Sequence, residues 1–307
     1  MIGVIPAAGL GRRMHPLTLN IPKPLLPVLN KPIIQHVIDC MRSAGIDEII
    51  VVVGYMKEKI MDKLKDLEDI EVKFVEQKKI DGTVSAIKLA GKHIDDDFVV
   101  MWGDNFFRAK LDDLIYSHLK KRAKISLILD RYSKTGAKAY IKGGKIVGAE
   151  ERPKAGVKNG YSFAGVYAFS HDILDLVDYV EKAESGEYEM SDLLQSAIEM
   201  GYDINYVWLE GWRVNVTTPL DLLNVNLRAL NEMNTSYFIG KNCKISGKIV
   251  RSVLCDDVVV EKSLVRDSLI MGGAEIRNSR LGRVIVQGNR IVNGATITIK
   301  NSDVGIL

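Results

Sequence analysis

Short apolar runs alternate with longer amphipathic segments along the first half and more of the chain. Each apolar run is bounded by polar or turn-forming residues, as is typical of strands buried on both faces. These runs cover residues 2–7, 48–54, 70–77, 98–105 and 125–130. Between them, apolar residues recur at the three- and four-residue spacing of helices in residues 32–45, 56–67, 83–94 and 111–122. The pattern predicts repeated β-α units.

Repeated β-α units predict an α/β fold, with a Rossmann-like mixed, mostly parallel sheet between helices. Ligands bind outside the carboxyl ends of such strands, so the loops that follow strands are where chemistry is expected. Residues 139–153 have the pattern of a hairpin that turns at Gly143 and Gly144, and residues 161–170 that of a further strand. We expect these two segments to form an extra lobe beside the sheet.

A helix is predicted after the sheet, within residues 217–233. Thr218 is its expected N-cap, Pro219 takes the first helical position and Asp221 lies in the first turn. We expect this helix to bridge two modules of the chain.

Beyond that helix, aliphatic residues recur every six positions, with Gly, Asn, Ser and Asp between them. The repeat comprises Val258, Leu264, Ile270 and Ile276, and then Val286 and Val292. Six residues make one face of a left-handed β-helix, in which stacked coils bury inward aliphatic side chains. Because several repeats are broken, a small irregular β domain is the alternative. The unfinished apolar faces suggest docking on the same chain or, in a homo-oligomer, on a partner subunit.

The 307 residues exceed one typical domain, and the patterns divide them into three predicted parts. These are a catalytic domain at 1–217, a bridging helix at 218–235 and a short left-handed β-helix at 236–307.

Composition narrows the class of protein further. Hydrophobic residues make up 47% and charged residues 26% of the chain, and no apolar stretch approaches the ~20 residues of a membrane span. The start, "MIGVIPAAG", lacks the basic segment of a secretory signal, so a cytoplasmic protein is expected. Three cysteines without a CxxC pair argue against disulfides and zinc. A net charge of +3 without a basic face argues against nucleic acid as a partner.

The stretch "AAGLGRRMHPLTLNIPKPLLPV" directly follows the first predicted strand. Gly9 and Gly11 let the backbone approach a ligand and direct N–H groups at phosphate oxygens. Arg13 follows at once, and Lys23 stands between two prolines, so two cations are fixed beside the glycines. Two common phosphate motifs are absent, since Met14 replaces the third glycine of G-x-G-x-x-G and no P-loop triplet follows. Alone, the two glycines could form an ordinary turn.

This stretch resembles the signature of the sugar-1-phosphate nucleotidylyltransferases, G-x-G-(S/T)-R-(M/L)-x-P-x-T followed by P-K-P-L-L-P. The chain has G-L-G-R-R-M-H-P-L-T from Gly9 and P-K-P-L-L-P from Pro22. It departs at Arg12, where the family usually carries a small hydroxyl residue. The resemblance extends over residues 1–217, and the six-residue repeats are similar to the tails of longer members.

The resemblance implies a nucleotide site at the start of the chain. Ala8, Gly9 and Gly11 would line the phosphates, Arg13 would bind the β and γ phosphates, and Lys23 would reach the phosphates between which the bond is exchanged.

A magnesium ion is the cofactor that the resemblance implies. Asp104 follows a predicted strand in "WGDN", and the matching family residue binds Mg²⁺. A second ligand comes from a motif similar to W-x-D-(V/I)-x-T-P-x-D-L, which here reads W-R-V-N-V-T-T-P-L-D-L with Asn215 at the ligand position. An amide oxygen can coordinate Mg²⁺ but carries no charge. Turn residues are the alternative for Asp104 and Asn215.

The segment "EQKKIDGTVSA" resembles the part of the family that recognises the base. Gln77 would face the base edge and Gly82 would bring the backbone close. A glutamine can donate and accept, which suits uracil or thymine. A surface loop that opens the next helix is the alternative.

The segment "AEERPK" is similar to the family's E-K-P motif. It implies that Glu151 binds sugar hydroxyls and that Arg152 stands where a lysine usually contacts the sugar phosphate. A guanidinium keeps the charge but changes the geometry. Further positions matching sugar-contacting residues of the family are Asn105, Gly136, Gly165 and Glu189.

The resemblance implies an enzyme that transfers a nucleotidyl group from dTTP or UTP to a sugar-1-phosphate, glucose-1-phosphate above all, and releases pyrophosphate. Arg13, Lys23, Asp104 and Arg152 would be its catalytic residues. An acyltransferase using the β-helix is one alternative, although all five histidines precede the repeats. A non-catalytic sugar-nucleotide sensor is the other, with Arg12 and Asn215 marking lost activity.

Overall fold

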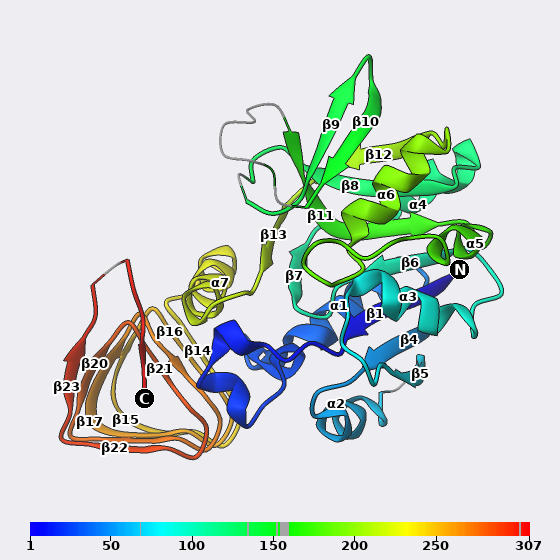
Figure 1. Cartoon of the computed structure of the whole chain (residues 1–307). Coiled ribbons are helices and arrows are strands. Elements are labelled where there is room, and N and C mark those ends of the chain that lie inside the picture. The colour runs from blue at the N-terminus through cyan, green and yellow to red at the C-terminus, as the bar shows by residue number, and fades with distance from the viewer. Residues whose placement is uncertain (68, 134, 152, 154–159, 301) are drawn as a thin grey trace. The chain divides into compact units, whose positions relative to one another are not determined.

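The chain forms two compact units, each built from two separate stretches of sequence. The first comprises Met1–Gly9 and Val37–Arg213, and the second Leu10–His36 and Val214–Leu307. The computed structural model (Figure 1) describes residues 1–67, 69–133, 135–151, 153, 160–300 and 302–307.

Parallel strands form the centre of the first unit. The strand β1 (Ile2–Ala7) lies between β4 (Glu48–Val53) and β6 (Phe98–Met101), and β5 (Glu71–Glu76) pairs with β4. All four run in parallel, and β1, β4 and β6 are almost wholly buried, as strands covered on both faces must be. Each was predicted from its apolar run.

The strand β11 (Gly160–Phe169) brings antiparallel pairing into the sheet. It pairs with β6, with β8 (Ile125–Asp130) and with β9 (Lys138–Lys142). The strand β10 (Lys145–Glu150) continues from β9 through the predicted hairpin. The predicted mixed sheet is confirmed: among the described residues, β10 and β11 run opposite to the other strands of the sheet, which all share one direction.

Helices pack against this sheet, and their apolar stripes explain where they form. The four predicted helices are present as α1 (Ile33–Ser43), α2 (Lys57–Leu64), α3 (Thr83–Gly91) and α4 (Asp112–Lys121). The sequence pattern did not reveal α5 (Ile173–Val177), α6 (Met190–Glu199), β7 (Asn105–Arg108), β12 (Ile204–Trp208) or β13 (Trp212–Asn215). The strand β12 adds in parallel to β8, and β7 pairs with β13.

The second unit begins with the glycine- and proline-rich stretch. It forms the short 3₁₀ turns η1 (Arg12–Met14), η2 (Leu17–Leu19) and η3 (Lys23–Leu25), followed by the hairpin β2 (Pro27–Val28) and β3 (Lys31–Pro32). The predicted bridging helix is α7 (Pro219–Glu232). Thr218 and Asp221 form a capping box, because each side chain bonds the backbone N–H of the other.

Parallel strands continue the second unit from Tyr237 onward. One ladder contains β14 (Tyr237–Ile239), β16 (Ser252–Leu254), β18 (Leu269–Ile270), β21 (Val284–Val286) and β24 (Gly305–Ile306). A second sheet contains β15 (Lys244–Val250), β17 (Val259–Arg266), β19 (Glu275–Arg277), β20 (Arg280–Gly282), β22 (Ile291–Asn293) and β23 (Thr296–Thr298). Figure 1 shows them as stacked turns of chain, an arrangement compatible with a β-helix. We call residues 237–307 the C-terminal module.

The register of this module corrects the six-residue repeat. Successive strands pair mostly at an offset of 16 residues, as for Val260 with Ile276 and Ile276 with Val292. The buried residues of one turn, such as Leu254, Val260, Val265 and Ile270, are therefore six, five and five residues apart. Leu264, predicted to point inward, is half-exposed, and Val265 is buried in its place.

No helix among the residues that the structure describes is long and apolar enough to cross a membrane.

Candidate active site

The carboxyl edge of β1 and β6 carries three of the predicted site residues of the first unit. Ala8 is buried and Gly9 is exposed just after β1. Asp104 follows β6 and is half-buried. The N–H of Gly103 donates to Pro6 O at 3.1 Å, which fixes the loop before Asp104 against the end of β1. The two loops thus lie at the edge where ligands of parallel sheets bind.

The two residues predicted to recognise the base are bonded to each other. Gln77 is buried, with 4% of its surface exposed, and its Nε2 donates to Gly82 O at 3.1 Å. Gly82 has φ of +114°, and a Cβ there would stand 2.4 Å from Tyr188 O, so only glycine fits. The next residue along from Tyr188 is Glu189, a predicted sugar contact. Gly82, predicted to contact the base, and Glu189, predicted to contact the sugar, therefore lie on neighbouring stretches of backbone.

Asn105 and Gly165, both predicted sugar contacts, also lie together. The Nδ2 of the fully buried Asn105 donates to Ala164 O at 2.7 Å. Gly165 has φ of +77° at the bulge of β11, and a Cβ on it would lie 2.9 Å from Asn105 Nδ2 and 3.0 Å from Trp102 Cε3. The side chain of Asn105 is held in one orientation by this backbone.

The acidic residues of the predicted sugar site gather at the start of α6. Glu151 accepts from Ser191 Oγ at 3.2 Å, and Glu189 is the N-cap residue of the helix. Burial, reinforced by the charge of Glu189, raises the pKa of the Asp192 carboxyl. Carboxylates held at a helix N-terminus are oriented acceptors, and sugar hydroxyls are suitable donors for them.

Seven buried side-chain polar atoms of the first unit have no hydrogen-bond partner among the described residues, and four of the seven are Trp102 Nε1, Asn105 Oδ1, Tyr167 OH and Arg213 Nε. Trp102 and Tyr167 are neighbours, with ring centroids 6.1 Å apart. Buried polar groups normally have partners, so unsatisfied ones beside a predicted site are candidates for ligand contact.

Three of these residues were missed by sequence reasoning. Trp102 stands in the quoted "WGDN", directly before the Gly-Asp-Asn turn, and this adjacency was the available signal. Tyr167 lies mid-strand and Arg213 lies between Trp212 and Asn215 without any spacing that marks them. Arg213 Nε lies 3.7 Å from Asp130 Oδ2. Burial lowers the pKa of the Arg213 guanidinium.

Two predicted sugar-site residues are not joined to this group. Gly136 is exposed and has no atom within 4 Å of where its Cβ would be. Arg152 lies outside the residues that the structure describes.

In the second unit, the glycine- and proline-rich stretch folds on itself. A Cβ on Gly11 would lie 3.1 Å from Lys23 Cβ and 3.2 Å from Thr18 Cγ2. The Oγ1 of Thr18 donates to Gly11 O at 2.9 Å, and Gly11 has φ of +63°. Gly11 thus permits the close approach that brings Lys23 beside the loop, while Arg13 is exposed on η1.

Asn215 fits the predicted role of a metal ligand in one respect. Its Oδ1 is buried and has no hydrogen-bond partner among the described residues. An amide oxygen and a carboxylate such as that of Asp104 are the hard donors that Mg²⁺ accepts, with phosphate and water completing the set. Within the described residues, no group of three or more His, Cys, Asp or Glu side chains is arranged to hold a metal.

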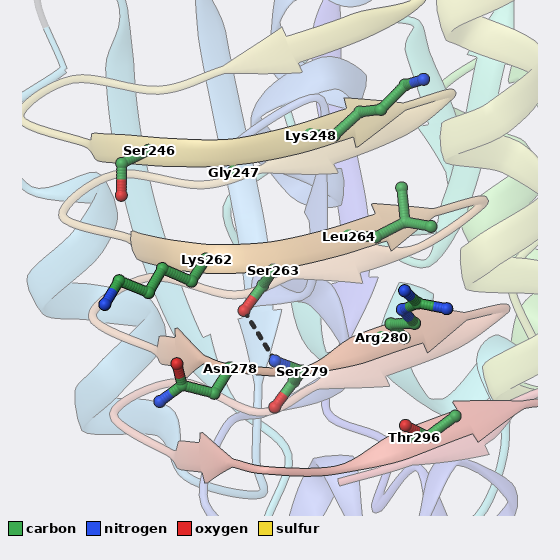
Figure 2. A pocket seen from close by; sticks show the side chains of 10 residues that line it. All are labelled: Ser246, Gly247, Lys248, Lys262, Ser263, Leu264, Asn278, Ser279, Arg280 and Thr296. Carbon is green, nitrogen blue, oxygen red and sulfur yellow. Dashed lines mark hydrogen bonds between the residues drawn. The ribbon is translucent and has the colours of Figure 1, made fainter.

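The C-terminal module has a hollow of about 590 Å³ on its outer surface (Figure 2). Its lining is polar and cationic, with Lys248, Lys262 and Arg280 among ten residues and no histidine. The Oγ of Ser263 accepts from the N–H of Ser279 at 2.9 Å, so these hydroxyls serve the backbone. An acyl-transfer site that uses a histidine base is not present in this hollow.

The chain belongs to the nucleotidyl transferase family, whose model matches residues 2–232. Among curated relatives, the bifunctional protein GlmU of Methanococcus aeolicus is 33% identical over 252 residues, which are 81% of this chain and 60% of that protein. The chain thus spans less than two thirds of the length of this relative.

A shorter relative is covered almost completely. The UTP–glucose-1-phosphate uridylyltransferase AglF of Haloferax volcanii is 32% identical over 227 residues, which are 72% of this chain and 93% of that protein. The fold is also that of a solved Bacillus anthracis structure described as a glucose-1-phosphate thymidylyltransferase. The TM-score is 0.69 at 24% identity, over 75% of this chain and 95% of the other.

Proposed function

We propose that this protein transfers a nucleotidyl group from a pyrimidine nucleoside triphosphate, dTTP or UTP, to a sugar-1-phosphate, and releases pyrophosphate. One observation carries the proposal above the others. The bonded pair Gln77 and Gly82 lies against Tyr188, beside the acidic residues at the start of α6. A base and a sugar joined by a diphosphate need two such polar sites on one edge of a sheet.

Charge neutralisation and positioning are what the reaction demands of the protein. A sugar-1-phosphate oxygen attacks the α-phosphorus in line, and the bond from that phosphorus to the pyrophosphate oxygen breaks. The attacking phosphate is already ionised near neutral pH, so no general base is required. Arg13, Lys23 and Arg152 would bind the crowded phosphate oxygens and fix the two substrates.

Mg²⁺ is the proposed cofactor, with Asp104 and Asn215 as its protein ligands. When bound, it would neutralise charge on the triphosphate. Asp104 contributes a carboxylate and Asn215 the buried amide oxygen described above.

Glucose-1-phosphate is the proposed acceptor, and the name of the AglF relative supports it. Within this proposal Glu151 and Glu189 accept hydrogen bonds from sugar hydroxyls. Asn105 and the backbone at Gly165 bound the ring, and Gly136 approaches it from the loop after β8.

The remaining organisation follows the same proposal. The catalytic domain at 1–217 is joined by the helix at 218–235 to a left-handed β-helix at 236–307. The ladders of parallel strands support that architecture. A cytoplasmic homo-oligomer, assembled through the β-helix, is the proposed state of the protein.

Pyrophosphate release, measured over a grid of nucleoside triphosphates and sugar-1-phosphates with Mg²⁺, tests the proposal. We expect dTTP or UTP with glucose-1-phosphate to be the best pair. Arg13→Ala and Asp104→Ala should each lower turnover by about 10²-fold or more, the scale of losing a preorganised charge. The exposed residues Arg42 and Asp62 provide matched controls, whose alanine variants should retain wild-type turnover.

Three outcomes of this experiment would contradict the proposal. A preference for purine nucleotides would contradict the role of Gln77. Wild-type turnover in either test variant would contradict the assigned charges. Binding of sugar nucleotides without any pyrophosphate release would instead favour the sensor, and transfer from acetyl-CoA would favour an acyltransferase.

A further inference from the structure

The hairpin β2–β3, which follows Lys23, is held by side chains from the last third of the chain. We propose that Asn226 of α7 and the pair Asn30–Asp256 are positioning residues for Lys23. Through them the C-terminal module sets the strength of triphosphate binding without touching the substrate. The inference rests on the phosphate-binding role of Lys23 in the proposed function.

Asn226 uses its whole side chain to fix the hairpin to α7. It is fully buried, and its Oδ1 accepts from the N–H of Leu29 at 2.8 Å. Its Nδ2 donates to Pro27 O at 3.0 Å and to Leu222 O at 2.9 Å. A polar residue with no exposed surface on an otherwise apolar helix face would be replaced by an aliphatic one if only packing mattered. These hydrogen bonds show that Asn226 fixes the hairpin to α7.

Asn30 and Asp256 join the tip of the same hairpin to the C-terminal module by two reciprocal bonds. The Nδ2 of Asn30 donates to Asp256 Oδ1 at 2.8 Å, and Asn30 Oδ1 accepts from the N–H of Asp256 at 3.2 Å. The same Oδ1 of Asp256 accepts from the N–H of Lys241 at 2.6 Å. A Cβ on Gly240 would stand 2.5 Å from that oxygen, so the glycine leaves room for this arrangement.

The hairpin transmits its position to Lys23 through a short and rigid path. Leu29 and Asn30 form its tip with φ of 48° and 65°, which leaves the tip a narrow range of conformations. Before it, the N–H of Leu26 donates to Lys23 O at 3.1 Å, and Leu26 itself is fully buried. Proline on either side of Lys23 limits the backbone further. Only five residues, 24–28, lie between the lysine and the tip.

The backbone of Lys23 is thus fixed from both sides. Gly11 approaches its Cβ on one side, and the clamped hairpin follows on the other. In Figure 1 the hairpin belongs to the dark blue chain that runs beside α7. If the hairpin were freed, Lys23 would still carry its charge but would meet the phosphates in many orientations. Loss of preorganisation of this kind weakens binding of the charged group.

The first test removes the Asn30–Asp256 bonds with Asn30→Gly and Asp256→Ala. Glycine deletes the amide while tolerating the positive φ of Asn30, so backbone strain is not introduced. We expect each variant to raise the KM for the nucleoside triphosphate about tenfold and to change the KM for the sugar-1-phosphate less than twofold. Asp256→Asn keeps an acceptor at the same place and should restore most of the affinity.

A double-mutant cycle separates positioning from general loss of structure. Lys23→Gln is combined with Asn30→Gly, and kcat/KM for the triphosphate is measured for all four proteins. If Asn30 acts through Lys23, Asn30→Gly should cost less than twofold once the lysine is gone. Losses that simply multiply, or a wild-type KM in both Asn30→Gly and Asp256→Ala, would overturn the inference.

Binding of inorganic tripolyphosphate with Mg²⁺, measured by calorimetry, makes the test independent of catalysis. Asn30→Gly should weaken it about tenfold, and Asn234→Gly, at an exposed asparagine of positive φ, should not. If no sugar nucleotide is formed but tripolyphosphate binding depends on Asn30, the proposed function fails and this inference stands. Equal binding by the wild type and Asn30→Gly overturns the inference whatever the activity.

Discussion

At the scale of single residues, the site depends on backbone conformations and close contacts that only glycine accommodates. Gly11, Gly82 and Gly165 have positive φ, and each leaves less than about 3.3 Å for an added Cβ. The sequence pointed to Gly11 by its place after the first predicted strand, and to Gly82 and Gly165 by resemblance. The close contacts that make glycine necessary come from Thr18, Tyr188 and Trp102, and no spacing in the sequence reveals those distances.

Gly165→Ala tests the residue scale, with Gly201→Ala as its matched control, since Gly201 is exposed and has no atom within 4 Å of where its Cβ would be. Both glycines have φ near +80°, so both variants carry the same backbone strain of about 1–2 kcal/mol. Only at Gly165 does the new methyl group meet Asn105 and Trp102. We expect Gly165→Ala to lower the melting temperature more than the control does, and to raise the KM for the sugar-1-phosphate about tenfold. Equal effects of the two variants would contradict the role given to this contact.

At the scale of elements, apolar periodicity located the predicted strands and helices of the first unit well. β1, β4 and α3 carry enough apolar residues in register to be recognised without their neighbours. The strands β7 and β13 were missed because each has only four residues and is stabilised by its partner. Phe106 on β7 packs on Trp212 of β13, with ring centroids 5.3 Å apart, and a contact across a hundred residues leaves no local pattern.

The junction of α4 with β8 gives a pH prediction at this scale. His118 on α4 is 1% exposed and its Nδ1 lies 2.9 Å from Ser126 Oγ of β8. Burial lowers the pKa of His118 below its ordinary value of 6.5, although the Asp97 carboxylate opposes the shift. The unfolded chain therefore binds the proton more readily. The stability from this group is complete above pH 6.5 and is lost as the pH falls below that value.

We expect the free energy of unfolding to drop between pH 7.5 and 5.5, with His118 contributing at most about 1.4 kcal/mol per pH unit. Urea unfolding of His118→Gln should show a smaller drop over this interval. His93 is exposed, so His93→Gln should follow the wild type. A steeper loss in His118→Gln than in the wild type would reverse the sign argued here.

At the scale of the whole molecule, the C-terminal module shows where sequence periodicity falls short. A six-residue rule places Leu264 inside, whereas strand pairing at offsets of 16 residues buries Val265. Successive buried residues of one turn are spaced six, five and five residues apart. The backbone pairing between turns sets this spacing. The sequence alone could predict stacked parallel strands but not which aliphatic side chain of a neighbouring pair faces inward.

Ile276→Ala tests whether the second unit behaves as one cooperative body. Ile276 is fully buried in the module core, so the substitution should cost about 2–5 kcal/mol. Hydrogen exchange should then become faster in the module and also at the amides of Leu25 and Leu26, which belong to the same unit. Amides of β1 should keep their rates. Ile291 lies on the surface with 67% exposed, and Ile291→Ala should change none of them.

The chain passes from one unit to the other after Gly9, after His36 and after Arg213. Neither body is therefore encoded by an uninterrupted piece of the gene. If the coding sequence were cut ahead of α7, residues 10–36, which carry Arg13 and Lys23, would lose the rest of their unit. A recombination event that replaces α7 and the C-terminal module must supply new hydrogen-bond donors and acceptors for the hairpin β2–β3. We therefore expect residues 10–36 and residues 214–307 to be inherited together.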